Sequence, residues 1–339
     1  MFAQSEITAQ EAALSVLFPV LQNGRIGYID NIGQLVVPPQ FNVTDVNFRV
    51  LSAVTLRAFR EGLAPVKIAD RWGYMDATGA LIIPEQFEEA SAFHAGLAAV
   101  KIAGQWGAID TSGNIIVNPQ FDEMGGFSDG IASVRKNGKW GYITASGEYL
   151  VRPQFEELSG GRWTSINSQP AHGHFSEGFA GARVGEKWGY IDRTGRFVII
   201  PQFDGAHSFY QGMAAVKIGD KWGFIDDTGT LAINPQFDDV GGFGCERAPA
   251  KSMDLWGFID GFGSWAANPQ FEDAYSFYEE MAAVRSGDKW GYVDATCRFA
   301  ITPQFDEAGD FAFGLAPVRV RDQWGYINPQ GMYIWNPTV

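Results

Sequence analysis

The sequence is poor in the residues from which reactive sites are built. It has two cysteines and four histidines among 339 residues, and two cysteines are too few for a disulfide framework. Neither a phosphate-binding Walker loop nor a dinucleotide-binding glycine fingerprint occurs. A serine or cysteine nucleophile also needs a histidine-based partner set, which the scattered histidines do not offer. We therefore expect a protein that is not an enzyme, with no catalytic residues, no metal and no cofactor.

Basic residues are scarce too. There are 25 lysines and arginines against 39 aspartates and glutamates, which gives a formal net charge of −14. A surface this acidic repels nucleic acid phosphates and anionic lipid headgroups. No stretch approaches the roughly 18–20 apolar residues of a membrane span. These features argue against nucleic acid as a partner and against membrane insertion. They leave solubility, or recruitment of a basic partner or of cations, as the role of the charge.

The N-terminal residues carry no lysine or arginine before Arg25, so they do not form an intact signal peptide. They resemble the start of a mature exported protein to which a methionine has been added. The scarcity of cysteine fits either side of a bacterial membrane. The compartment is therefore unknown, with periplasmic or extracellular export favoured over the cytoplasm.

What the sequence does have is a repeat. Trp-Gly pairs recur every 34 residues, with one interval of 48, and a ninth copy begins at Ile26-Gly27, 46 residues before the first pair. The repeated tryptophans are Trp72, Trp106, Trp140, Trp188, Trp222, Trp256, Trp290 and Trp324. A fixed period of this length indicates one structural unit that packs against its own copies. We interpret these tryptophans as packing residues rather than as exposed ligand contacts.

The irregular intervals have one origin. A Pro-Gln-Phe element follows most copies, and a second phenylalanine normally lies six residues after it. At about 42–58 and 156–174 this spacing is longer by 12 and 14 residues, which explains the intervals of 46 and 48. Both insertions fall at the same point of the unit, so both loops should emerge from the same face of the array.

The Lys-Trp-Gly-Tyr-Ile runs at 139–143 and 187–191, with the glycine and the Pro-Gln-Phe element that follow, resemble the bacterial WG-repeat family, also called KWG repeats. The resemblance covers residues from about 20 to 337. It implies a repeat protein. It is uninformative about activity, because the family occurs in proteins of varied roles.

Each copy predicts three short strands. Asn137-Gly138 is a strong hairpin signal, and Asp226 to Gly229 predicts a turn capped by aspartate with glycine at positive φ. We expect the glycine after each tryptophan to permit close approach of an aromatic ring or a neighbouring backbone. The third strand should end at the proline. The Pro-Gln-Phe piece should form a fourth short strand, or a helical turn, that crosses to the next copy.

Stacking of such units predicts an all-β repeat protein. We expect residues 20–339 to form an open β-solenoid or superhelix, because an open array needs no fixed number of copies. Apolar spacing and a capping-box pattern predict a short helix at about 9–17 within an N-terminal cap, residues 1–19. The alternative is a closed β-propeller. Nine blades exceed the typical four to eight, and 34 residues are short for a blade of about 40–45.

Function is expected where the repetition fails. The second insertion holds an arginine–tryptophan pair typical of interface anchors and two histidines spaced as in some zinc sites, without a third ligand nearby. The first insertion is apolar enough to dock on the array or on a partner. The candidate binding residues are Arg162, Trp163, His172, His174, Phe48 and Leu51. Repeated carboxylate pairs such as Asp238-Asp239 predict a structural acidic ridge, with calcium binding as the alternative.

The sequence thus favours a non-enzymatic scaffold that presents an extended acidic surface to another protein. Two alternatives are a carbohydrate- or cell-wall-binding module that uses exposed aromatic residues, and a purely structural spacer. Neither the identity of the partner nor the oligomeric state follows from the sequence.

Overall fold

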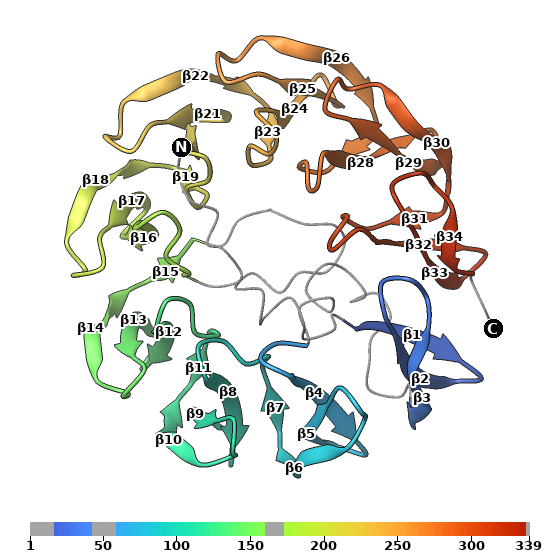
Figure 1. The fold of residues 1–339 in the computed structure, drawn as a ribbon. Helices are drawn as coiled ribbons and strands as arrows, with labels where there is room; N and C mark the ends of the chain where they lie inside the picture. The colour runs from blue at the N-terminus through green and yellow to red at the C-terminus, as the bar shows by residue number, and fades with distance from the viewer. Residues whose placement is uncertain (1–16, 43–58, 160–172, 337–339) are drawn as a thin grey trace.

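The computed structural model describes residues 17–42, 59–159 and 173–336, and all regular structure in these ranges is β. Nine antiparallel sheets follow one another around a central axis and close into a ring (Figure 1). The protein is therefore a nine-bladed β-propeller, and the prediction of an open solenoid is wrong. The described residues include no helix long and apolar enough to cross a membrane.

The blades follow the chain in order. Blades 1 and 2 comprise β1 (Phe18–Gln22), β2 (Arg25–Ile29), β3 (Leu35–Asn42), and β4 (Leu63–Ile68), β5 (Arg71–Asp76), β6 (Leu81–Phe87). Blades 3 and 4 comprise β7 (Glu89–Ala90), β8 (Leu97–Ile102), β9 (Gln105–Asp110), β10 (Ile115–Phe121), and β11 (Glu123–Met124), β12 (Ile131–Lys136), β13 (Lys139–Thr144), β14 (Tyr149–Phe155). Blade 5 comprises β15 (Glu157–Leu158), β16 (Ala180–Val184), β17 (Lys187–Ile191) and β18 (Phe197–Phe203).

The second half of the ring repeats the same plan. Blades 6 and 7 comprise β19 (Gly205–Ala206), β20 (Ala214–Ile218), β21 (Lys221–Ile225), β22 (Leu231–Phe237), and β23 (Asp239–Val240), β24 (Ala248–Ser252), β25 (Leu255–Ile259), β26 (Trp265–Phe271). Blades 8 and 9 comprise β27 (Asp273–Ala274), β28 (Met281–Ser286), β29 (Lys289–Asp294), β30 (Phe299–Phe305), and β31 (Glu307–Ala308), β32 (Ala316–Val320), β33 (Gln323–Ile327), β34 (Tyr333–Trp335).

A complete blade fits into 34 residues because its innermost strand has only two. Figure 1 shows these short strands nearest the axis and the longest strands, such as β22, at the rim. The rim strand of one blade runs straight into the inner strand of the next, so blade and sequence repeat are out of phase. The Pro-Gln-Phe piece therefore leads into a fourth strand, one of the two predicted forms.

The rim strand explains the Trp-Gly pair. It does not end at the proline, as predicted, but continues to the phenylalanine: Trp222 pairs with Phe237 and Phe224 with Ile233, and a bulge lies between these pairs. The bulged backbone passes directly over Gly223, where a Cβ atom would lie 2.5 Å from Ile233 O and 2.7 Å from Pro235 N. Only glycine fits there, so the predicted close backbone approach is confirmed.

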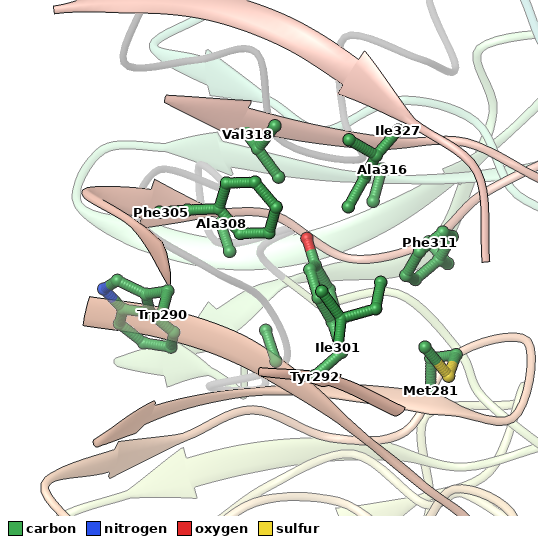
Figure 2. Packing of buried hydrophobic residues seen from close by; sticks show 11 residues of the cluster. Met281, Trp290, Tyr292, Ile301, Phe305, Ala308, Phe311, Ala316, Val318 and Ile327 are labelled. Carbon is green, nitrogen blue, oxygen red and sulfur yellow. The ribbon is translucent and has the colours of Figure 1, made fainter. Parts of the chain in front are cut away.

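The hydrophobic core lies between blades. Figure 2 shows one cluster, in which Tyr292 and Ile301 of blade 8 pack against Ala316, Val318 and Ile327 of blade 9. The Tyr292 hydroxyl donates a hydrogen bond of 2.8 Å to a carbonyl of blade 9, that of Gly309. Equivalent clusters fill the other junctions, so the core is a continuous ring of aromatic and aliphatic side chains.

Hydrophobic packing also closes the ring between blades 9 and 1. The Phe18 and Tyr326 rings are 5.5 Å apart, and the Tyr326 hydroxyl donates to Pro19 O at 2.9 Å. In blade 3 the carbonyl that corresponds to Pro19 O is that of Ala99, and it accepts a hydrogen bond from the inner-strand N–H of Ser91 instead. Within the described ranges, no strand is exchanged across this seam. The helix predicted at 9–17 lies outside the described residues except for Leu17, which is not helical and is fully buried.

Candidate functional site

The ring has two faces, because successive strands of a blade are antiparallel. The hairpin face carries the two-residue hairpin turns, such as Gly219-Asp220, and the corners that follow Pro-Gln-Phe. The turn face carries the Asp-x-x-Gly turns, such as Asp226–Gly229, and the inner turns, such as Tyr210–Met213. We compare the chemistry of these two faces, since both are made from the same repeat.

On the hairpin face, the first acidic residue after Pro-Gln-Phe joins two blades. Asp238 lies at the corner that leads into blade 7. It accepts one hydrogen bond of 2.5 Å from Lys221 Nζ of blade 6 and another of 3.0 Å from the N–H of Met253 in a hairpin turn. The lysine hydrogen bond, and then the N–H, hold the pKa of Asp238 below its usual value. The same ion pair recurs as Lys139–Glu156, Lys187–Asp204 and Lys289–Asp306.

The second acidic residue forms an ion pair within its own blade. Glu89 lies 2.7 Å from Lys101 Nζ, and Glu157 lies 2.9 Å from Arg183 Nε, each across the inner and second strands. Glu123–Arg135 and Glu307–Arg319 repeat this arrangement. The carboxylate pairs of the sequence are therefore largely neutralised by lysines and arginines on the hairpin face.

On the turn face, aspartates cap turns without a basic partner. Asp226 Oδ1 accepts from Thr228 N–H at 3.0 Å, from the Thr228 hydroxyl at 2.6 Å and from Thr230 N–H at 2.9 Å. The threonine hydrogen bond is the main cause that lowers the pKa of Asp226. Equivalent bonds lower the pKa of Asp76, Asp110, Asp192 and Asp294, with an asparagine in place of the threonine at Asp110. These carboxylates stay ionised; nearby arginines, Arg196 and Arg298, add to the lowering of the pKa at Asp192 and Asp294, whereas no basic group contributes at Asp76, Asp110 and Asp226.

Net charge is therefore divided unequally between the faces. Eleven of the twelve ion pairs between described residues lie on the hairpin face, and only Arg193–Asp129 lies on the turn face. The hairpin half holds 20 acidic and 17 basic described residues, against 15 and 5 on the turn face, and the buried Asp310 is counted in neither. The turn-face acids are Asp30, Glu61, Asp76, Asp110, Asp129, Glu148, Glu177, Asp192, Asp226, Asp227, Glu246, Asp260, Glu279, Glu280 and Asp294; the bases are Arg60, Arg193, Arg196, Arg247 and Arg298.

Large apolar side chains also stand on the turn face. At the position of Thr228, blade 7 has Phe262, which is 89% exposed, and blade 1 has Ile32, which is 74% exposed. Beside Phe262, the Cβ position of Gly261 lies 3.9 Å from Met213 Cε of blade 6. Met213 is joined to the partly exposed Tyr210 by an isolated β-bridge. We name Tyr210, Met213 and Phe262 the aromatic patch.

Most residues predicted to bind a partner lie outside the described part of the chain: Arg162, Trp163, His172, Phe48 and Leu51. His174 is described and half-buried, next to the buried Phe175. The described ends of the second insertion meet at the inner strand of blade 5, where Gly173 N–H donates to Ser159 O at 3.2 Å.

None of the eight repeated tryptophans is exposed. Trp140, Trp256 and Trp290 are buried and the other five are half-buried. Their rings contact the inner strands and corners: Trp290 stacks on Tyr275 at 4.7 Å, and His207 lies 4.5 Å from Trp222. An exposed aromatic ladder, which the carbohydrate-binding alternative needs, is not formed by these residues.

The junction between blades 7 and 8 contains an exchange of residue sizes that the sequence interpretation did not identify. Cys297 occupies the glycine position of an Asp-x-x-Gly turn at φ 62°, and the rim residue that would face it is the small Ala267 rather than isoleucine or valine. Both pack against one cluster, together with Cys245. Burial raises the pKa of Cys297, while a hydrogen bond from Arg247 opposes that shift. Comparison of turn glycines with their facing rim residues would have found this exchange of sizes.

One serine matches a nucleophile-elbow pattern, Gly126-Phe127-Ser128-Asp129-Gly130. An elbow needs a turn from a strand into a helix. Ser128 instead stands in an inner turn, closed by reciprocal backbone hydrogen bonds of 2.8 and 3.0 Å with Ile131. Among the described residues, no three histidine, cysteine, aspartate or glutamate side chains are grouped so as to hold a metal ion.

Comparison with known proteins places the repeat in a family. The family described as WG containing repeat matches residues 26–45, 72–106, 106–140, 173–188, 188–222, 222–252, 256–290 and 290–324. No curated protein sequence matches the chain.

Solved structures resemble the whole ring. One described as the crystal structure of the eukaryotic initiation factor has a TM-score of 0.62 at 10% identity, over 96% of this chain and 97% of that chain. Hsv2p of Kluyveromyces lactis has a TM-score of 0.41 at 10% identity, over 69% and 86%. The dihydro-heme d1 dehydrogenase NirN has a TM-score of 0.46 at 11% identity, over 93% and 75%. At these identities the likeness concerns the fold alone, and the first match supports the closed propeller.

Proposed function

The chain belongs to the WG-containing repeat family, and we propose that its ring is a non-enzymatic binding platform whose turn face receives a protein with a basic surface. The observation that carries this proposal is the charge difference between the faces. Fifteen acidic residues stand against five basic ones on the turn face, whereas the hairpin face is nearly balanced.

The cause of the difference supports a binding role for the turn face. Carboxylates on the hairpin face have partners within the ring, so they contribute to its assembly. The capping aspartates of the turn face accept hydrogen bonds only from neutral N–H and O–H donors, so little of their charge is neutralised within the ring. A potential of one sign over one face attracts and orients an oppositely charged partner and suppresses partners of like charge.

Charge-matched variants test the proposal. The turn-face variant carries Glu148→Gln, Asp227→Asn and Glu280→Gln, and the hairpin-face variant carries Glu186→Gln, Asp220→Asn and Asp288→Asn. Fluorescence anisotropy with a peptide of eight lysines should show weakened binding to the turn-face variant and nearly unchanged binding to the other. Equal losses in both variants, or equal binding of an octaglutamate peptide, would contradict a directed face. Affinity isolation with the same three proteins then identifies natural partners, which should have high isoelectric points.

A glycan array tests the carbohydrate-binding alternative on the same protein. Since the repeated tryptophans are packed, we expect no specific glycan signal. A reproducible signal that survives neutralisation of the turn face would favour the alternative.

A further inference from the structure

We infer that the aromatic patch of Tyr210, Met213 and Phe262 is the anchoring point of the turn face, and that it takes a protein segment in which lysine or arginine adjoins an apolar side chain. This inference rests on the proposed function and adds to it the place and the chemistry of recognition.

The first support is the residue that Phe262 replaces. In the blade 2, 5, 6 and 8 turns, a threonine at this position donates its hydroxyl to the capping aspartate at 2.6 Å. Phe262 cannot make that bond and exposes 89% of its surface to solvent. The turn does not require it, because Asp260 still accepts from the N–H groups of Phe262 and Ser264 at 2.9 and 3.0 Å. The hydroxyl hydrogen bond of those four turns is thus absent from this turn, and the ring that replaces the hydroxyl is exposed to solvent.

The second support is continuity across a blade junction. Phe262 belongs to blade 7, while Tyr210 and Met213 belong to the inner turn of blade 6. The Cβ position of Gly261 lies 3.9 Å from Met213 Cε, so the two turns are neighbours, and Tyr210 is itself 41% exposed. A single exposed apolar residue on a surface is ordinary, but two exposed aromatic residues on neighbouring turns, with a methionine on one of them, offer an adaptable contact surface.

The third support is the charge around the patch. The turn of Phe262 itself holds Asp260, and the other turn-face turns of blades 6 and 7 hold Asp226, Asp227 and Glu246. The turn-face residues of blade 6 include no basic residue, and in blade 7 Arg247 is engaged by Cys297 and by Glu246 O. Carboxylates beside aromatic rings recognise cations through both ion pairing and cation–π contact, and the apolar stem of the same partner residue packs on the rings.

This chemistry points to a protein rather than a membrane. Lysine and arginine side chains combine a cation with an aliphatic stem, and aromatic anchors within a charged rim are typical of protein interfaces. An anionic lipid surface would meet the carboxylates with repulsion.

The test compares Phe262→Thr with Ile32→Thr. Both variants restore the residue common in the other turns, both remove one exposed apolar side chain from the turn face, and neither changes charge. The probes are two peptides of equal charge, four Lys-Trp repeats and four Lys-Gly repeats. The wild-type ring should bind the Lys-Trp peptide more tightly. Phe262→Thr should weaken binding of the Lys-Trp peptide by about two- to fivefold and leave binding of the Lys-Gly peptide unaffected. Ile32→Thr should change the affinity for neither peptide.

The possible outcomes separate the inference from the proposed function. If Phe262→Thr weakens the Lys-Trp peptide no more than Ile32→Thr does, the inference is overturned, while the turn-face charge variant still tests the platform. If the wild-type ring binds neither peptide, both proposals fail. Tyr210→Ser supplies a second variant, which should reduce Lys-Trp binding in the same direction. Unchanged circular dichroism and melting temperature verify that the rings are intact.

Discussion

The junction between blades 8 and 9 and the junction between blades 4 and 5 are built from the same repeat but solve one problem differently. At the first, the Tyr292 hydroxyl donates to Gly309 O of the neighbouring blade. At the second, the equivalent Tyr142 hydroxyl is buried and has no hydrogen-bond partner in the described part of the chain. The carbonyl in the equivalent place, Ser159 O, accepts instead from Gly173 N–H at the end of the second insertion.

This difference teaches that an insertion is anchored at the expense of a contact between blades. The regular junction keeps its hydrogen bond because the chain turns directly from the inner strand into the inner turn. Where a loop departs and returns, its own backbone must be satisfied first, since buried N–H groups rarely remain unpaired. The aromatic packing survives, with the Tyr142 and Phe175 rings 4.8 Å apart. Packing thus tolerates an irregularity that the hydrogen bond does not.

The strongest way to break a junction is to overfill it. Ala267→Ile restores the rim residue common in other blades, but in this ring it meets Cys297 instead of glycine. We expect a loss of about 1–3 kcal/mol in the free energy of unfolding, typical of overpacked sites. Urea denaturation followed by tryptophan fluorescence measures it.

The matched control is the double variant Ala267→Ile/Cys297→Gly, which restores both members of the regular pair. It should recover most of the lost stability, because Cys297 adopts a positive φ that glycine tolerates better. A double-mutant cycle gives the coupling between the two sites. Additive effects would show that the two side chains do not compensate each other.

An effect of intermediate size on stability should distinguish the regular junction between blades 8 and 9 from the junction that carries the insertion. Tyr292→Phe removes a donor and leaves Gly309 O unsatisfied, which should cost about 1 kcal/mol. Tyr142→Phe removes only an unpartnered hydroxyl, so it should be neutral or slightly stabilising. Thermal melts of the two variants, measured side by side, give the comparison. Equal destabilisation by both substitutions would refute the idea that the insertion displaces a hydrogen bond between blades.

The smallest effect belongs to the exposed ion pairs on the hairpin face. Lys221→Met removes the partner of Asp238 and should lower Tm slightly, whereas Gln105→Lys, which offers Asp122 such a partner, should raise it slightly. The pKa of Asp238 is lowered in the folded ring. Its contribution is therefore present above the unfolded pKa, near 4, and is lost as pH falls through the folded pKa. Melts between about pH 7 and pH 3 should show a weaker pH dependence in Lys221→Met; an unchanged dependence would exclude this pair as a source.

The sequence was informative wherever a residue type has one structural reason. The Asp-x-x-Gly turns and the Asn137-Gly138 hairpin turn were predicted from turn chemistry and are confirmed. The glycine of each Trp-Gly pair was also assigned correctly, since close backbone approach excludes every other residue. Closure was predicted wrongly, because nine blades exceed the typical number and 34 residues seemed too few for a blade. A two-residue inner strand is too short to produce an alternating pattern, so the sequence could not distinguish a fourth strand from a helical turn.

The candidate site was harder to predict, because it depends on contacts between copies. Asp238 is neutralised by Lys221, 17 residues earlier and on the neighbouring blade, and no local pattern pairs them. The acidic ridge was correctly interpreted as structural, and it lies on the hairpin face. Most of the unpaired acidic charge lies on the opposite face, and the exposed Phe262 stands at a position that most other copies fill with threonine or serine.

The phase shift between sequence repeat and blade has a consequence for how such a ring can grow. Each 34-residue copy supplies three strands to one blade and the inner strand to the next. Unequal recombination could remove or duplicate one copy between equivalent positions. After either event, every rim strand would still lead into the inner strand of a following blade. Among the described residues, the seam between blades 9 and 1 is joined by side-chain packing and by the hydrogen bond from Tyr326 to Pro19 O rather than by a shared strand. The number of blades is thus free to drift by whole units, and a circularly permuted chain with new ends at any corner should assemble the same ring.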